Sequence, residues 1–509
     1  MSTYRYEQLE AALHELKQID LEIVKLGQIG SLLHWDLETQ LPPGGVAQRA
    51  EQLSYLSGLS HDKATQPRIG ELLAILTFGG KPVDALSDLD SRRVRAAKRA
   101  YDQEVKLPRE YVEELSRVTS LANHAWVEAR KNNDFASYAP HLKQIVDLNR
   151  RAAEYLGYED HPYDALLDRF EQGMTVKTLD RVFGELRIKL VDLVDRIKAV
   201  PQVRTDFLTR SYPGDAQEAF SRRIAGDLGY DFSRGYLTVS AHPFTMDLSS
   251  DDVRITTRYE ENYLPSALFG TIHEAGHAMY EQGFLDEIKN TGLASGTSLG
   301  IHESQSRFWE NVVGRSRQFW HRYYSDLVQV FPEQLRDVDL EEFYRGINNV
   351  QPSMIRVEAD EVTYGLHVIL RYEIEKQLIT GELEVDDLPG VWNRHMEDFL
   401  GIVPANDSEG VLQDVHWAHG AIGYFPTYAL GNLYGAQFTG QMEADLGPLA
   451  PLVQEGNFSA ILDWLRRNIH VHGSAKTPAE LLQDITGQEL QAQPFIDYLE
   501  AKYREIYQL

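Results

Sequence analysis

The segment "TIHEAGHAMY", residues 271–280, places two histidines and a glutamate among small and apolar residues. His273 and His277 are four residues apart, so on a helix their imidazoles share one face and can bind the same metal ion. Glu274 projects about 100° round the helix from His273, beside such an ion rather than onto it. A carboxylate placed there suits a general base that takes a proton from water. The HExxH pattern therefore predicts a hydrolytic metal site.

The alternative interpretation is a pair of histidines at a helix surface beside a solvated glutamate. The frequencies of His and Glu give roughly 0.05 accidental HExxH matches in a chain of this length. The context favours a metal site, because Pro265 suits an early helical position. Leu268, Ile272 and Met279 form an apolar stripe on the face next to the histidines.

A catalytic zinc site usually has three protein ligands and one open position, so a third ligand is needed. A histidine six residues after His277 would continue the metzincin pattern, but Gly283 stands there and Tyr280 replaces the expected glycine. The later segment "GIHESQSRFWE" offers Glu303 and Glu310, two turns apart on one helical face. We favour Glu303, which lies among polar neighbours, although the residues alone leave both glutamates open.

Two further motifs lie in a predicted sheet, "HPF" with His242 and "DVRIT" with Arg254. The edge of a strand beside the HExxH helix can pair with an extended peptide, so both residues are candidates for substrate binding. From the residues alone, the favoured alternative is a hairpin whose charges are solvated. The strands are expected near 236–240 and 253–259, as a small antiparallel sheet.

The stretch "IRVEAD" contains Arg356, whose planar guanidinium can hold both oxygens of a carboxylate. We expect Glu358 and Asp360 to orient it and predict that it anchors the substrate's C-terminal carboxylate. The alternative is a surface arginine beside acidic residues at a helix start.

The stretch "GVLQDVHWAHGAIGYFPTY", residues 410–428, is dense in polar and aromatic residues and suits the wall of a pocket. Gln413 is a candidate for substrate binding. His416 or Tyr424 can donate a hydrogen bond to the oxyanion that forms during peptide hydrolysis. The alternative is a buried polar network that joins two helices.

The elements that must position these residues are mainly helices, which apolar periodicity predicts at 178–199, 214–228, 305–330, 359–380 and 491–506. The sequence contains no repeat or long linker, so we expect one interlocked unit over 1–509. Within it, 1–230 is a helical N-terminal part, 231–430 holds the sheet and the motifs, and 431–509 adds C-terminal helices.

The composition narrows the classes of partner and ligand. The formal net charge is -27, which disfavours nucleic acid and membrane surfaces as partners. With 0 cysteines, a metal must be held by His, Asp or Glu. No signal peptide and no apolar run of membrane-spanning length is recognisable, so we expect a cytoplasmic protein.

The motifs stand in the order HPF, DxRxT, HExxH, HESQ, IRxxAD and GxxQDxHW. This succession closely resembles the thermostable carboxypeptidase Taq family of zinc metallocarboxypeptidases. The resemblance runs from "LLHWDLETQLPPGG" near residue 32 to beyond Tyr428, and so covers essentially the whole chain. Leu41 stands where the family pattern has methionine, a peripheral difference.

The resemblance implies a mainly helical, two-lobed fold with a deep cleft, broadly like neurolysin and angiotensin-converting enzyme. It implies a homodimer with one zinc ion per chain, replaceable by cobalt, and Glu303 as the third metal ligand. It also implies removal of single C-terminal residues from peptides, with broad specificity but with C-terminal proline usually spared. The competing functions are an oligo-endopeptidase on the same scaffold and a non-catalytic helical peptide-binding protein.

Overall fold

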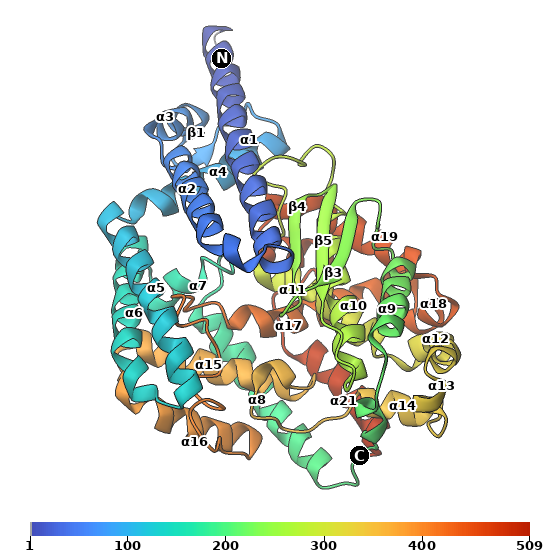
Figure 1. Ribbon diagram of the computed structural model, residues 1–509. Helices are drawn as coiled ribbons and strands as arrows, with labels where there is room; N and C mark the ends of the chain where they lie inside the picture. The colour runs from blue at the N-terminus through green and yellow to red at the C-terminus, as the bar shows by residue number, and fades with distance from the viewer. Residues whose placement is uncertain (1–2) are drawn as a thin grey trace.

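The computed structural model describes residues 3–509, in which helices surround a small sheet (Figure 1). The helices before the sheet are α1 (Thr3–Thr39), α2 (Val46–Ala64), α3 (Pro67–Leu76), α4 (Asp88–Lys106), α5 (Arg109–Asn132), α6 (Phe135–Leu156), α7 (Pro162–Leu167), α8 (Val176–Lys198) and α9 (Gly214–Leu228). The sheet contains β3 (Gly235–Val239), β4 (Thr245–Ser249) and β5 (Asp252–Thr257), and a two-stranded ribbon contains β1 (Thr77–Phe78) and β2 (Lys81–Pro82).

The helices after the sheet are α10 (Leu264–Glu281), α11 (Leu299–Arg307), α12 (Arg317–Val330), α13 (Pro332–Leu335), α14 (Leu340–Ile347), α15 (Thr363–Thr380), α16 (Leu388–Leu400), α17 (Pro426–Leu446), α18 (Leu449–Glu455), α19 (Phe458–Asn468), α20 (Pro478–Thr486) and α21 (Gln493–Tyr507). Short 3-10 helices are η1 (Pro43–Gly45), η2 (Asp206–Thr209), η4 (Arg356–Glu358), η5 (Val385–Asp387) and η6 (His470–Ala475), and η3 (Phe308–Gly314) is a π-helix. The mainly helical class is thus confirmed. No helix among residues 3–509 has the length and apolar character needed to cross a membrane.

The helices follow the predicted periodicity closely, with one interruption. The expected helices at 178–199, 214–228 and 491–506 correspond to α8, α9 and α21. The expected helix at 305–330 is broken, because the π-helix η3 lies between α11 and α12. Such a π segment turns the side chains that follow it relative to a continuous α-helix, and π-helices often occur at functional sites.

The predicted antiparallel pairing of 236–240 with 253–259 is wrong. β3 pairs in parallel with β5, and a strand that the sequence did not reveal, β4, pairs antiparallel with β5. The physical reason is the tight turn at residues 250–251, which folds β5 back along β4 and leaves β3 on the other side of β5. The HPF motif lies in the loop that crosses from β3 to β4 over the end of the central strand.

The sheet has two chemically different faces, because alternate residues of a strand point to opposite sides. Val253 and Ile255 of β5 are buried in the main core, and Thr257 accepts a hydrogen bond from Thr271 of α10 at 3.1 Å. This face therefore lies against α10. The opposite face meets α1, where the guanidinium of Arg254 lies 5.6 Å from the ring centroid of Trp35.

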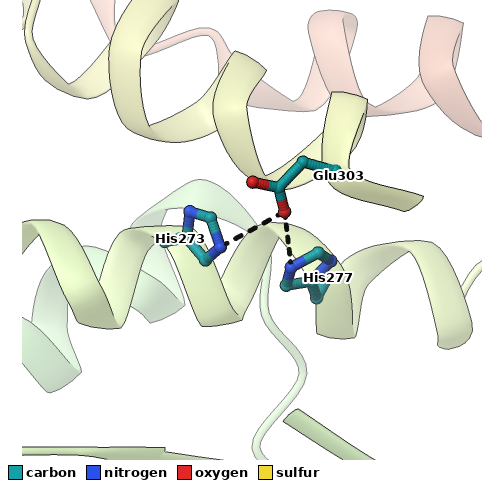
Figure 2. A group of neighbouring side chains, drawn as sticks. All are labelled: His273, His277 and Glu303. Carbon is teal, nitrogen blue, oxygen red and sulfur yellow. Dashed lines mark ion pairs between the residues drawn. The ribbon is translucent and has the colours of Figure 1, made fainter. Parts of the chain in front are cut away.

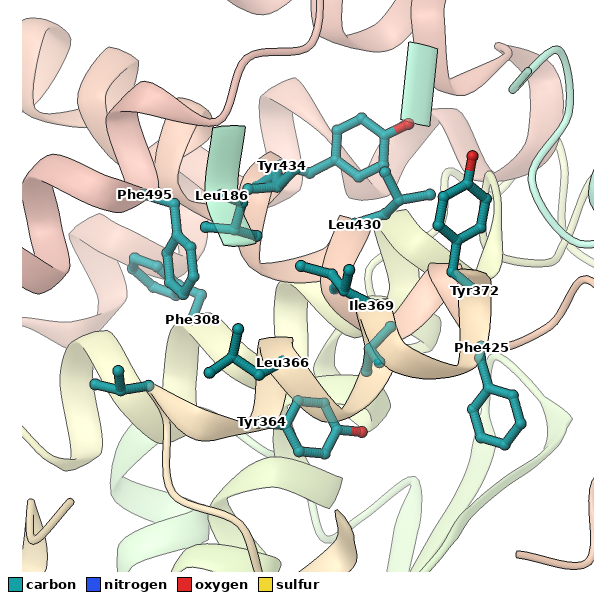
Figure 3. Close-up of a cluster of buried hydrophobic side chains, with 14 of the residues drawn as sticks. Leu186, Phe308, Tyr364, Leu366, Ile369, Tyr372, Phe425, Leu430, Tyr434 and Phe495 are labelled. Atoms are coloured by element: carbon teal, nitrogen blue, oxygen red, sulfur yellow. The ribbon is translucent and has the colours of Figure 1, made fainter. Parts of the chain in front are cut away.

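The apolar core has two parts. The larger cluster joins helices from α5 to α21, and its centre includes Leu366 and Ile369 of α15, Leu430 of α17 and Phe495 of α21 (Figure 3). A smaller cluster joins α1, α3 and α4. The centrally packed helices α10 and α11 carry the candidate metal ligands, so burial fixes the backbone to which these side chains are attached.

Candidate active site

α10 presents the HExxH residues as expected. Pro265 lies in the first helical turn, where its missing N–H costs no helical hydrogen bond. Leu268, Ile272 and Met279 are buried, so the predicted apolar stripe is the face that packs into the core. This leaves His273 and His277 side by side on a partly accessible face, with ring centroids 4.9 Å apart.

Glu303 of α11 meets both histidines, and the three side chains point toward one another (Figure 2). Its Oε2 lies 3.6 Å from Nε2 of His273 and 3.4 Å from Nε2 of His277. One nitrogen or oxygen atom of each residue lies within 4.8 Å of the others. Two imidazole nitrogens and one carboxylate oxygen are a donor set that zinc accepts, with a position left for water or substrate.

The electrostatics of the cluster fit a metal site. Burial lowers the pKa of His277 to about 3, so its imidazole is neutral and can act as a ligand. Burial opposes ionisation of Glu303, but Arg307 and the two histidines outweigh it and hold the pKa of this carboxyl well below its usual value. Arg307 donates from Nε to the other oxygen, Oε1, at 2.7 Å, which leaves Oε2 directed at the histidines.

Glu310 contacts the opposite nitrogen of the same histidine. Its Oε2 lies 2.9 Å from Nδ1 of His273, the ring atom that faces away from Glu303. A carboxylate on the second nitrogen fixes the orientation and tautomer of a ligating histidine. Of the two glutamates that the residues left open, Glu303 therefore belongs to the donor cluster, and Glu310 supports His273 from behind.

His277 has an equivalent support that the sequence did not single out. Its Nδ1 contacts Nδ1 of His302, whose Nε2 lies 2.7 Å from Oε1 of Glu281. Both histidines of the donor cluster are thus held at the nitrogen that faces away from it. In the sequence, the position of His302 beside Glu303 indicated that it lies near the site. Only the packing of α11 against α10 shows that its ring contacts His277.

Glu274 is held beside the cluster by the sheet. Thr245 of β4 donates from its hydroxyl to Oε2 of Glu274 at 2.7 Å. Burial raises the pKa of Glu274, which makes this carboxylate a better proton acceptor than an exposed one. Thr245 pairs with Ile255, so it lies on the sheet face that meets α10. It was missed because β4 itself was not predicted.

Arg356 lies in a buried charge cluster rather than at a surface. It is 5% exposed and donates from Nη2 to Oδ1 of Asp414 at 2.8 Å. Arg371 donates from Nε to Oδ2 of the same carboxylate at 2.7 Å. The expectation that Glu358 and Asp360 orient Arg356 is wrong, because Glu358 is exposed and Asp360 instead accepts hydrogen bonds at the start of α15.

This cluster connects with the candidate metal ligands through aromatic and charged contacts. Nη1 of Arg356 donates to the hydroxyl of Tyr364 at 3.1 Å. The guanidinium of Arg307, which holds Glu303, lies over the Tyr364 ring at 4.4 Å from its centroid. Arg356 therefore lies one aromatic residue away from the side chain that holds the candidate third ligand.

The other three residues predicted to bind substrate, Arg254, His242 and Gln413, lie outside the arginine–aspartate pairing that surrounds Arg356. Arg254 lies on the sheet face away from α10 and is held by Asp252, from Nε and Nη2 at 2.8 Å each. His242 is exposed in the β3–β4 loop. The amide oxygen of Gln413 accepts from Arg356 N and Arg371 Nη2, and its nitrogen donates to two backbone carbonyls. These contacts use both the oxygen and the nitrogen of the Gln413 amide within the protein. The side chain therefore holds its own motif against Arg356 and Arg371.

His416 and Tyr424 lie together beside Arg356, with ring centroids 5.4 Å apart. Burial lowers the pKa of His416 to about 4, so its ring is neutral. Its Nε2 lies 3.5 Å from the hydroxyl of Tyr428, and its buried Nδ1 faces Oδ1 of Asp414 at 3.8 Å, beyond hydrogen-bond distance. His416 therefore adjoins both the charge cluster of Arg356 and the hydroxyls of the aromatic residues.

A family model described as "Carboxypeptidase Taq (M32) metallopeptidase" matches residues 15–503. The chain belongs to this family. Among curated proteins it is 43% identical to carboxypeptidase 1 of Bacillus subtilis, over 98% of this chain and 100% of the relative. It is 44% identical to thermostable carboxypeptidase 1 of Thermus thermophilus, over 98% and 99% of the two chains.

Solved structures of M32 enzymes share the fold. The crystal structure of the M32 carboxypeptidase from Deinococcus radiodurans superposes with a TM-score of 0.95 at 42% identity, over 98% of this chain and 100% of that one. Metallocarboxypeptidase 1 of Trypanosoma cruzi gives 0.92 at 36% identity, over 97% and 99%. The present chain is accordingly a metallocarboxypeptidase, and the resemblance seen in its motifs is confirmed. Its family implies a divalent metal ion, for which His273, His277 and Glu303 supply a fitting donor set.

Proposed function

We propose that the chain is a zinc carboxypeptidase that releases single amino acids from peptide C-termini, with broad specificity and with C-terminal proline disfavoured. One zinc ion would be held by His273, His277 and Glu303, and cobalt would replace it. The observation that carries the proposal is the position of Glu274, held by Thr245 beside this donor set. Zinc supplies Lewis acidity and lowers the pKa of water when bound.

In this proposal Glu274 accepts the proton of the attacking water and passes it to the leaving amine. Metal analysis of the purified protein, with peptide hydrolysis measured before and after chelation, tests the proposed function. Loss of activity on chelation, and recovery with zinc or cobalt, is the expected result. A protein that hydrolyses peptides equally well without metal would contradict it, and so would one that binds peptides without hydrolysis.

The carboxylate anchor proposed for exopeptidase action is Arg356. Two arginines, Arg356 and Arg371, share the single carboxylate of Asp414, so this buried cluster has one excess positive charge. Three of the five N–H donors of Arg356 are used by Asp414 and Tyr364, which leaves two for a ligand. A substrate carboxylate would neutralise the excess charge and accept both remaining donors.

Arg356→Ala is expected to lower kcat/KM for free-acid peptides by about 10- to 100-fold, because hydrogen bonds to charged groups contribute about 1.5–3 kcal/mol. Metal content should stay at the parent value. The decisive measurement compares a peptide with its C-terminal amide. The parent should strongly prefer the free acid, and Arg356→Ala should hardly distinguish the two.

Arg356→Lys should restore little of this preference, because a single ammonium cannot replace the guanidinium fork. Arg254→Ala is the comparison variant, since Arg254 lies on the other face of the sheet. If Arg254→Ala loses the preference and Arg356→Ala keeps it, the anchor is Arg254. A parent that cleaves amide and acid equally would indicate the alternative, an oligo-endopeptidase.

We also propose that His416 or Tyr424 donates a hydrogen bond to the oxyanion. The neutral ring of His416 and its position beside Tyr424, with ring centroids 5.4 Å apart, support this assignment. Removing such a donor typically lowers kcat by about 10²- to 10³-fold. We expect His416→Ala or Tyr424→Phe to show this loss with metal content unchanged. Parent values of kcat and KM in both variants would place these residues in the protein's internal network instead.

A homodimer in the cytoplasm is proposed as well. Helix α2, all of which the structure describes, has no buried residue and exposes Val46, Tyr55 and Leu59, the apolar side chains that a second copy could cover. Sedimentation of the parent and of Tyr55→Glu tests the dimer, and a monomeric parent at micromolar concentration would refute it. Cell fractionation tests the location.

A further inference from the structure

The segment that carries His416 and Tyr424 has no helix or strand in residues 402–425, all of which the structure describes. Side chains on irregular segments are positioned by tertiary contacts, because no regular backbone hydrogen bonding fixes them. The neighbouring helix α15 supplies these contacts from two residues one turn apart. Arg371 binds Gln413 and Asp414 in the middle of the segment, and Glu375 binds Trp417 and Gly423 nearer its end.

Glu375 is fully buried and uses each carboxylate oxygen for a different part of this segment. Its Oε1 accepts from the indole N–H of Trp417 at 2.7 Å. Its Oε2 accepts from the backbone N–H of Gly423 at 3.0 Å and from the hydroxyl of Tyr163 at 2.6 Å. Trp417 directly follows His416, and Gly423 directly precedes Tyr424.

The carboxylate thus ties both ends of the 416–424 turn to α15. Gly423 permits the close approach, since it has a positive φ of 98° and a Cβ there would meet the backbone of Leu166 at 2.9 Å. The Trp417 ring is fixed as well, packed edge-on against Trp392 with centroids 6.0 Å apart. The hydrogen bonds to the carboxylate and the surrounding packing therefore hold the turn in the same conformation.

We propose that Glu375 is a positioning residue for catalysis, which sets the placement of His416 and Tyr424 through the turn between them. The inference rests on the proposed oxyanion role of these two residues. Glu375 itself makes no hydrogen bond to either of them, because its side-chain hydrogen bonds within residues 3–509 go to Tyr163, Trp417 and Gly423. A misplacement of about 1 Å at a catalytic group can cost about 10²-fold in rate.

Glu375→Gln is the sharpest test of this role. The N–H groups of Trp417 and Gly423 only donate, and they bind different oxygens. A glutamine side chain has one oxygen, so its NH₂ group must face one of these donors and release that end of the turn. We expect kcat to fall about 10- to 100-fold, with KM for free-acid peptides and the metal content within about twofold to threefold of the parent.

Tyr163→Phe is the matched control. It also removes one hydrogen bond to the buried Glu375 carboxylate, but from a residue outside the turn. We therefore expect Tyr163→Phe to lose about as much thermal stability as Glu375→Gln, while its kcat stays near the parent value. If Glu375→Gln does not fold, Trp417→Phe releases one end of the turn with little change in shape and should lower kcat in the same way.

A double-mutant cycle distinguishes positioning from a general structural effect. We measure the cycle in two backgrounds, Tyr424→Phe and His416→Ala. In the background that removes the oxyanion donor, Glu375→Gln should lower kcat by a clearly smaller factor than in the parent, because its effect acts through that donor. Factors equal to the parent's in both backgrounds would overturn the inference, as would parent kcat in both Glu375→Gln and Trp417→Phe. An inactive parent would instead refute the proposed function.

Discussion

Glu274→Gln is expected to keep the metal ion and to lower kcat by about 10²- to 10⁴-fold, the range that general acid–base catalysis contributes. The amide has the same shape as the carboxylate and can still accept the hydrogen bond from Thr245, so the geometry should persist. It cannot accept a proton from water at neutral pH. The measurement is kcat on a free-acid peptide, together with the metal content of the same sample.

Thr245→Val and Thr245→Ser form the matched pair for this experiment. The valine variant removes the hydroxyl that holds Glu274, whereas the serine variant keeps it. We expect an intermediate loss of kcat for valine and a small one for serine. The role of general base would be refuted if Glu274→Gln lost the metal but regained appreciable turnover when metal was added back.

His277→Ala is expected to strip the metal ion or to weaken its binding severely, and activity should disappear with it. The proposed site has only three protein ligands, so none is redundant. The loss of one leaves two, which should hold a metal ion far more weakly. The same result is expected for His273→Ala and Glu303→Gln. Metal stoichiometry after dialysis, measured with the activity on a free-acid peptide, provides the test.

Glu310→Gln separates a ligand from a supporting residue. Glu310 contacts Nδ1 of His273, whereas Glu303 faces Nε2 of both His273 and His277. Loss of a supporting carboxylate typically lowers metal affinity about 10- to 100-fold. Glu303→Gln should cost more than Glu310→Gln. The reverse order, or a His277→Ala protein with full metal and activity, would contradict the assignment of ligands.

The sheet shows where sequence patterns stop being informative. β4 contains Met246, Asp247 and Ser249, a mixture without clear alternation, and so it was not recognised as a strand. Its absence from the prediction also reversed the direction of the β3–β5 pairing. Strand order depends on which strands meet, and local propensity carries little of that information.

Arg356 shows the same limit for a charged side chain. Its neighbours in sequence, Glu358 and Asp360, were the natural partners to expect. In the structure its partner is Asp414, 58 residues later, because α15 brings Arg371 and the following segment back against it. The buried ion cluster and its excess charge therefore exist only in the folded chain.

The sequence by itself determined the features that depend on short spacings. The four-residue interval of His273 and His277, the apolar stripe of α10 and the periodicity of the long helices are properties of a local helix. The ordered motifs added the family, which the comparisons confirmed.

The tertiary structure alone decided which residues support these groups. It placed Glu303 at Nε2 and Glu310 at Nδ1 of His273, set Thr245 against Glu274, and tied the turn of His416 and Tyr424 to Glu375. Most of these contacts join different secondary-structure elements. Their geometry is set by how helices and strands pack, to within tenths of an ångström, and no periodicity along the chain encodes that packing.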